Sequence, residues 1–75
     1  MNDEIKLIHS FPKNALEEVR VYLSEYKRKP YLNLRVFYKA EDEQWKPTPK
    51  GLTLSVDLID ELVAAVAALR QEIDE

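Results

Sequence analysis

The sequence predicts an α+β fold with strands first and one helix last. Residues 16–26 and 31–39 each alternate apolar and polar side chains with a period of two, which is typical of half-buried strands. Residues 56–73 contain neither proline nor glycine, and their apolar side chains recur at spacings of three and four, as in an amphipathic helix. A chain of 75 residues is too short for two domains, so we expect residues 1–75 to form one.

Two strands are expected in the first third of the chain. Residues 4–10 can form a short strand, which Pro12 and Asn14 should end because proline lacks an N–H and asparagine favours turns. Residues 16–26 form the second strand, with one apolar and one polar face. The apolar face carries Val19, Val21 and Leu23, and the polar face carries Arg20, Tyr22 and Ser24.

The third strand is expected over residues 31–39, where the alternation resumes. Residues 27–30 read as the turn before it, because three adjacent cations resist burial and Pro30 cannot donate to a ladder. The second and third strands should therefore pair as an antiparallel hairpin.

The fourth strand is expected over residues 44–54, after an acidic turn. Two closely spaced prolines should interrupt its hydrogen bonding. Gly51 is the sole glycine of the chain, so we expect either a positive φ or a close backbone approach there. Ser55 is a good N-cap for a helix over residues 56–73.

The helix has more apolar surface than one small sheet can cover. A domain of this size needs an additional source of stability, and the chain has no cysteine for disulfides. Oligomerisation is the usual remaining source, so we expect a homodimer formed through the helix. The interface residues should be Ile59, Leu62, Val63, Val66 and Leu69.

Positive charge is concentrated in one part of an acidic chain. The net charge is −3, yet residues 26–51 hold seven cations against three acids and the rest of the chain holds four cations against eleven acids. Tyrosine, phenylalanine and tryptophan are interleaved with the cations of residues 26–51. Cations neutralise phosphates and aromatic faces stack on unpaired bases, so this combination indicates single-stranded nucleic acid.

The composition also argues against other functions. We find no nucleophile–base pair and no phosphate-cradling glycine loop, so we expect no enzymatic activity and no cofactor. One histidine and no cysteine make a metal site improbable. No apolar run is long enough to span a membrane, and the acidic N-terminus is unlike a signal peptide, which predicts a cytoplasmic, nucleoid-associated protein.

The order of motifs is similar to that of a known family. V-R-V occupies residues 19–21, Y-K-R-K residues 26–29, L-N-L-R residues 32–35, an aromatic pair residues 37–38, and K-P-T-P-K-G-L-T-L residues 46–54. This order resembles the transcriptional coactivator domain called positive cofactor four, whose pattern is V-x-V, F-K-G-K, I-D-I-R, an aromatic pair and K-P-G-R-K-G-I-S-L before a helix. The resemblance implies a curved four-stranded antiparallel sheet, a C-terminal helix that dimerises, and a groove for single-stranded DNA. We expect a minimal prokaryotic or phage member.

The resemblance also implies the DNA contacts, position by position. Tyr26 and Tyr38 would stack on bases, while Arg28 replaces the turn glycine of the family and adds a cation. Pro49 stands where the family has arginine and removes one. The full set of expected DNA-binding residues is Tyr26, Lys27, Arg28, Lys29, Arg35, Tyr38, Lys46 and Lys50.

Alternation along the third strand conflicts with part of this set. Arg35 and Phe37 should share one face, whereas Tyr38 should share the other face with Val36. If Arg35 and Tyr38 both touch DNA, a bulge, a sharp curve or a strand end must lie between them.

The expected function is that of a homodimeric single-stranded DNA-binding protein with little sequence preference, in transcription regulation or in protection of melted DNA. Two alternatives stay open. The same stacking surface would serve RNA, and the broad helix could instead dock a partner protein, for example from the transcription machinery.

Overall fold

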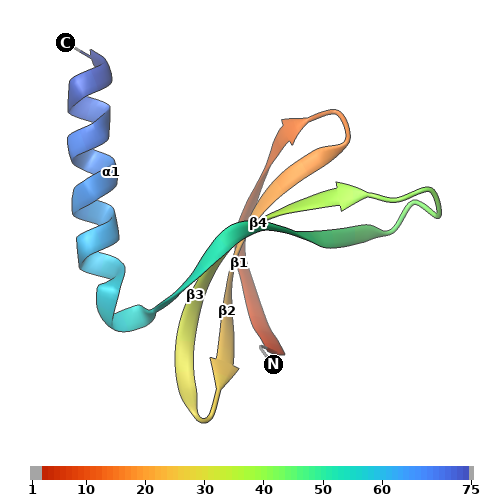
Figure 1. Ribbon diagram of the computed structural model, residues 1–75, viewed down its shortest axis with the longest axis horizontal. Coiled ribbons are helices and arrows are strands. Elements are labelled where there is room, and N and C mark those ends of the chain that lie inside the picture. The colour runs from red at the N-terminus through yellow and green to blue at the C-terminus, as the bar shows by residue number, and fades with distance from the viewer. Residues whose placement is uncertain (1–2, 75) are drawn as a thin grey trace.

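The computed structural model describes residues 3–74 and confirms a four-stranded antiparallel sheet followed by one C-terminal helix (Figure 1). The strand order in the sheet is the order along the chain, so every connection is a hairpin. A short 3₁₀ turn, η1, leads from the sheet into the helix α1. The bounds are β1 Asp3–Asn14, β2 Glu17–Tyr26, β3 Lys29–Lys39, β4 Trp45–Ser55, η1 Val56–Leu58 and α1 Ile59–Asp74.

The pairing of β2 with β3 confirms the faces that alternation predicts. Their register runs without interruption from Glu17 opposite Tyr38 to Tyr26 opposite Lys29. In this register apolar residues pair with apolar residues on one face. A slip of one residue would move the whole apolar set of one strand to the other face, which is why this register is favoured. The apolar pairs are Val19 with Val36, Val21 with Leu34, and Leu23 with Leu32.

The first strand is longer than the sequence predicts. The expectation that the strand ends at residue 10, before Pro12, is wrong: β1 runs through Pro12, which pairs with Glu18, and ends only at Asn14. β1 is an edge strand with β2 as its sole neighbour, so the missing N–H of proline can face away from the ladder. Three register shifts between β1 and β2 absorb the irregularity.

The turn between β2 and β3 is tighter than predicted. Only Lys27 and Arg28 form it, with φ of 51° and 65°, and Pro30 lies inside β3 opposite Glu25. Pro30 is tolerated because the pairing of β3 with β4 begins only at Tyr31, so this part of β3 has one neighbour. Two successive positive φ values are the geometry of a type I′ hairpin turn.

The pairing of the fourth strand is interrupted at the two prolines, as expected, and the interruption takes the form of a bulge. The strand itself continues before and after this bulge. Arg35 pairs with Gly51 and Phe37 pairs with Pro47, so three residues of β4 face a single residue of β3. Gly51 has a φ of 157°, and a Cβ there would lie 2.5 Å from the carbonyl oxygen of Leu34. The close backbone approach expected at Gly51 is thus confirmed, and it fixes β4 beside Arg35.

The helix begins where its cap predicts. The hydroxyl of Ser55 accepts a hydrogen bond from the backbone N–H of Asp57 at 3.2 Å. The first turn is 3₁₀, so α1 itself starts three residues later than expected and ends at Asp74. Among residues 3–74, no helix is long and apolar enough to cross a membrane.

The helix stands beside the sheet and does not cover it (Figure 1). No residue of α1 is buried, and the radius of gyration is 14.1 Å where a compact chain of this length has about 11 Å. The accessible surface is 6073 Å², against about 4800 Å² for a compact monomer of the same mass. A single chain therefore leaves apolar surface that its own fold does not bury.

Candidate nucleic-acid interface

The β2–β3 turn brings four of the expected DNA-binding residues together. Tyr26 pairs with Lys29 across the hairpin, and Lys27 and Arg28 form the turn between them. Tyr26 is 40% exposed, and the Lys27 ammonium lies 5.4 Å from the centroid of its ring. No ion pair to these three cations is found within residues 6–74, whose side chains the structure describes. Their charge is therefore uncompensated by those residues.

Arg35 lies in mid-strand on the same face as Tyr26 and Lys29. Its Nη1 donates to the backbone oxygen of Thr48 at 3.1 Å, and its Nη2 donates to the hydroxyl of Thr53 at 3.4 Å. Both acceptors belong to β4 and both are neutral. Arg35 is half-buried and forms no ion pair with any described side chain, so its position is fixed while its charge is retained.

A buried polar network continues from Thr53 across the sheet. The Thr53 hydroxyl donates to Asn33 Oδ1 at 2.8 Å, and Asn33 Nδ2 donates to Ser24 Oγ at 2.7 Å. Asn33 and Ser24 are 1% and 0% exposed, which makes them the most buried side chains of the sheet. No buried polar side-chain atom among the described residues lacks a partner, so the network is fully satisfied.

The β3–β4 turn holds Tyr38 and Lys46 in an acidic setting. Lys46 pairs with Tyr38 in register, and its ammonium lies 3.6 Å from the Asp42 carboxylate. These residues line a shallow hollow of about 410 Å³ together with Ala40 and Glu41. Tyr38 is 40% exposed, so a base can approach it, but the Asp42 carboxylate in the turn partly offsets the charge of Lys46.

Lys50 lies in the bulge of β4, and its positive charge makes a minor contribution to the lowered pKa of Glu17. The pKa of Glu17 is lowered from its usual value, first by a hydrogen bond from the Asn14 side chain, then by one from Lys13, with a smaller contribution from Lys50. Lys50 itself is exposed and makes no ion pair with the described side chains. Its backbone N–H donates to the Thr48 hydroxyl at 3.2 Å, which holds the bulge in shape.

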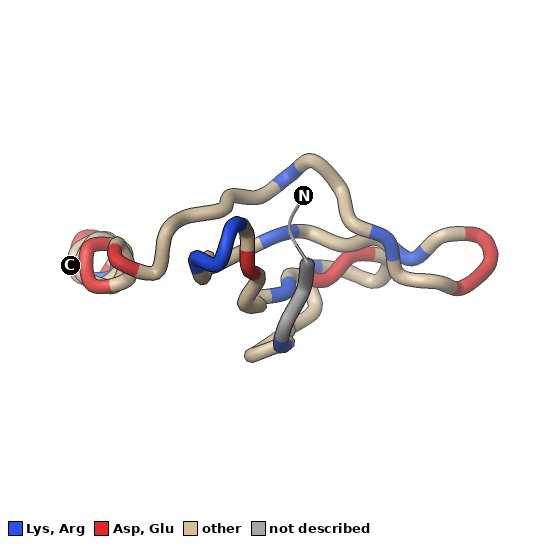
Figure 2. The backbone as a smooth tube through the Cα atoms, turned by 90° about the horizontal axis from the view of Figure 1, so that it is seen from below, with Lys and Arg blue, Asp and Glu red and all other residues tan. Residues whose placement is uncertain are grey.

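The expected residues thus fall into separate groups within one chain. Tyr26 and Tyr38 stand near opposite ends of the β2–β3 ladder, roughly 30 Å apart along the strand, with Arg35 between them. Figure 2 shows the acidic helix and the acidic β3–β4 turn at the two ends of the molecule, and the basic β2–β3 turn between them. The regular register of β3 with β2 also leaves Arg35 and Tyr38 on opposite faces, because the bulge lies in β4.

Sequence reasoning missed two features of the polar face. The first is the network from Thr53 to Ser24, and its signal was the presence of polar residues in mid-strand on the Arg35 face. The second is Arg20, which stands directly opposite Arg35 in the register. Arg20 pairs with Glu18 at 2.6 Å and lies 4.4 Å from the centroid of Phe37, the aromatic residue that proves to be core at 7% exposure.

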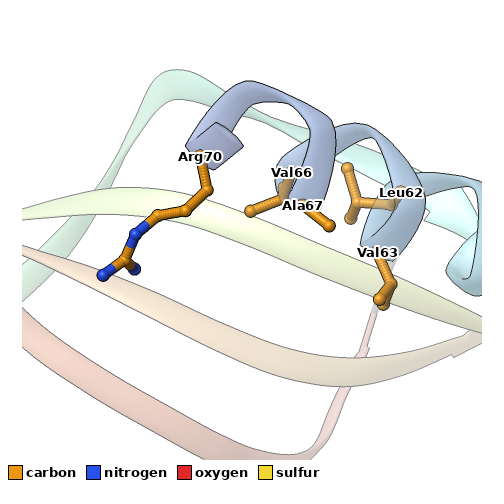
Figure 3. A pocket seen from close by; sticks show the side chains of 5 residues that line it. All are labelled: Leu62, Val63, Val66, Ala67 and Arg70. Atoms are coloured by element: carbon orange, nitrogen blue, oxygen red, sulfur yellow. The ribbon is translucent and has the colours of Figure 1, made fainter. Parts of the chain in front are cut away.

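Three of the five expected dimer residues, Leu62, Val63 and Val66, line an apolar hollow on α1 (Figure 3). It has a volume of about 450 Å³ and is lined by Leu62, Val63, Val66, Ala67 and Arg70. Val63, Val66 and Leu69 are 61%, 57% and 58% exposed, Ile59 is 38% exposed, and Leu62 is half-buried. Exposing apolar side chains to water is unfavourable, and a contiguous exposed apolar face of this kind is typical of a surface that binds another molecule.

Comparison with solved structures shows the fold in bacteria and in a phage. A PC4 homologue from Burkholderia pseudomallei superposes with a TM-score of 0.84 in its orthorhombic crystal form, at 21% identity, over 93% of this chain and 95% of that one. The tetragonal form gives a TM-score of 0.81 at 20% identity, over 87% and 96%. A bacteriophage T5 homologue of the eukaryotic transcription coactivator PC4, implicated in recombination-dependent DNA replication, gives 0.75 at 20% identity, over 97% and 81%.

The sequence comparisons identify the family. A search of curated protein sequences finds no match. The family model described as Transcriptional Coactivator p15 (PC4) matches residues 13–65, which is well over half of the chain and includes every expected DNA-binding residue. The chain therefore belongs to the PC4 family, a non-enzymatic family of single-stranded DNA-binding proteins, as its order of motifs predicted.

Proposed function

We propose that this protein is a homodimer that binds single-stranded DNA with little sequence preference, and that it regulates transcription or protects melted DNA. One observation carries the proposal: in an acidic chain, a set of cations in the β2–β3 turn, on β3 and on β4 lacks ion-pair partners among the described side chains. Uncompensated cations are the groups that a phosphate backbone neutralises. The set consists of Lys27, Arg28, Lys29, Arg35 and Lys50.

The strained turn supports a role for its cations. Lys27 and Arg28 both have positive φ, where glycine or asparagine would be favoured. A left-handed conformation costs a residue with a Cβ about 1–2 kcal/mol, and such strain concentrates at functional sites. Two long cations at a position that disfavours them are consistent with phosphate binding at this turn.

The contacts divide by chemistry. Lys27, Lys29, Arg35 and Lys50 would contact phosphates, and Arg28 would assist from the turn. Tyr26 and Tyr38 would each stack on a base, a contact worth about 1–3 kcal/mol by truncation. Lys46 would contact a phosphate only after its ion pair with Asp42 is broken.

The apolar surface that one chain leaves exposed supports dimerisation through α1. The excess over a compact monomer is on the order of 1300 Å² for each chain, which falls within the range buried per partner in permanent homodimers. A second copy of the chain supplies a matching apolar helix face. Tyr26 and Tyr38 lie far apart in one chain. The arrangement of the two chains in the dimer would therefore determine how many of the expected DNA-binding residues one DNA strand can contact.

Titration with labelled oligonucleotides tests the proposal. We expect oligo-dT to bind more tightly than duplex, with an affinity that falls steeply as salt rises, by about 0.7 in the logarithmic slope for each phosphate contact. Lys27→Ala combined with Lys29→Ala should lower both affinity and slope, whereas the matched pair Lys6→Ala with Lys13→Ala on β1 should lower them less. Equal losses in the two double variants would show that only general charge matters and would refute this site.

The same titration addresses the polymer. A preference for oligo-U over oligo-dT would make the protein an RNA binder, because the stacking surface itself does not distinguish the two sugars. Failure to bind either oligonucleotide would favour a protein-docking role for the helix.

A further inference from the structure

We propose that Thr53 is a positioning residue for Arg35, and that Asn33 and Ser24 set its orientation from neighbouring positions on the same face of the sheet. The inference deepens the proposed function, on which its DNA-binding consequence rests. The four residues come from three neighbouring strands: Ser24 from β2, Asn33 and Arg35 from β3, and Thr53 from β4. Their hydrogen bonds form one continuous series from a buried hydroxyl to the guanidinium.

The direction of each hydrogen bond carries the argument. Asn33 Nδ2 faces three acceptors, which are Ser24 Oγ at 2.7 Å and the backbone oxygens of Tyr22 and Tyr31 at 3.4 Å each. The amide oxygen therefore faces Thr53 and accepts its hydroxyl proton at 2.8 Å. With that proton committed, the oxygen of Thr53 presents only lone pairs to Arg35 Nη2.

The network leaves the charge of Arg35 intact. Thr53 and the Thr48 carbonyl take two of its five N–H groups, and both are neutral. Arg20, directly opposite on β2, differs in this respect, because it is ion-paired with Glu18 at 2.6 Å. A guanidinium that is held in place without a carboxylate keeps its charge and its remaining donors for an anion, and it loses little rotamer freedom on binding.

The positioning itself can be measured without nucleic acid. Nitrogen-15 relaxation of the Arg35 Nε–H group should report a rigid side chain in the wild-type protein. We expect Thr53→Val, which removes the hydroxyl at nearly constant volume, to make this group mobile, and Thr53→Ser to restore it. An Arg35 side chain equally rigid in Thr53→Val would overturn the inference, whether or not the protein binds DNA.

The consequence for binding is tested by a double-mutant cycle with oligo-dT. We expect Thr53→Val to weaken binding roughly 2- to 12-fold, the ordering cost of one long side chain, and Thr53→Ser to bind as the wild type does. In an Arg35→Ala background, Thr53→Val should have no further effect. The same loss in both backgrounds would overturn the inference, because Thr53 would then act independently of Arg35.

Two controls keep the outcome clear. Ser10→Ala removes an exposed hydroxyl from β1 and should leave binding unchanged. If Thr53→Val does not fold, as judged by circular dichroism, Ser24→Ala removes the far end of the series instead, and it should mobilise Arg35 to a smaller extent. Absence of oligo-dT binding by the wild-type protein would refute the proposed function, while the relaxation result would still decide the positioning role.

Discussion

Replacing Gly51 by alanine should destabilise the sheet where β4 crosses Arg35. The added Cβ would lie 2.5 Å from the Leu34 carbonyl oxygen and 2.8 Å from the Arg35 Cα, and both are backbone atoms that cannot rotate away. Such overpacking costs about 1–3 kcal/mol, and a φ of 157° costs an L-residue about 1–3 kcal/mol more. Alanine also lowers the conformational entropy of the unfolded chain, which offsets about 0.4–1 kcal/mol of this loss in stability. The net loss is about 3 kcal/mol, which corresponds to a fall in Tm of roughly 12–24 °C for a domain of this size.

Thermal unfolding followed by circular dichroism measures this loss, at one fixed protein concentration because the proposed dimerisation would make the apparent stability depend on concentration. Lys50→Ala is the matched control, since it changes the adjacent, exposed residue and should shift Tm by about 4 °C or less. A Gly51→Ala variant that melts within about 4 °C of the wild type would refute the close approach of β4 to Arg35.

Four further predictions follow from individual contacts. Asp42→Asn should free Lys46 and tighten oligo-dT binding by roughly 1.4- to 5-fold in fluorescence anisotropy, as expected for one surface ion pair; unchanged affinity would remove Lys46 from the site. Val66→Asp should yield a monomer of 8.8 kDa by light scattering at micromolar concentration, and persistence of twice that mass would place the interface elsewhere. Arg28→Asn should raise Tm, because asparagine tolerates the left-handed turn, while it weakens oligo-dT binding; a change of both in the same direction would contradict the strain argument. The folded pKa of Glu17 lies below its ordinary value of 4.5, so its stabilisation is complete above pH 4.5 and is lost as pH falls through the folded pKa. The stability difference between wild type and Glu17→Gln should therefore shrink in acid titrations, and a difference independent of pH would contradict it.

The faces of the central hairpin and the start of the helix could be predicted from the sequence because each has a local cause. Apolar residues at period two determine which side chains of β2 and β3 share a face, and a one-residue slip would move them to the other face. Ser55 caps the helix through a hydrogen bond to a residue two positions away. Gly51 signalled a close approach or a positive φ because it is the sole glycine of the chain, and a Cβ there would meet the Leu34 carbonyl oxygen.

Other features depend on tertiary context. A proline would end a strand in the interior of a sheet, but Pro12 is tolerated because β1 is an edge strand. The alternation of apolar and polar residues does not show which strands lie at the edges. The ion pair between Asp42 and Lys46 depends on the shape of a turn that composition does not specify. The separation of Tyr26 from Tyr38 depends on the unbroken register of β3. Residue types could therefore predict the chemistry of the surface, but not which of its groups lie together.

The location of the binding surface can be tested directly by NMR. Titration of the nitrogen-15-labelled protein with oligo-dT should shift the backbone amides of residues 26–29 and those around Arg35 and Lys50 more than any others. Changes confined to α1 or to β1 would contradict the account, since bound nucleic acid would then avoid the uncompensated cations of the sheet.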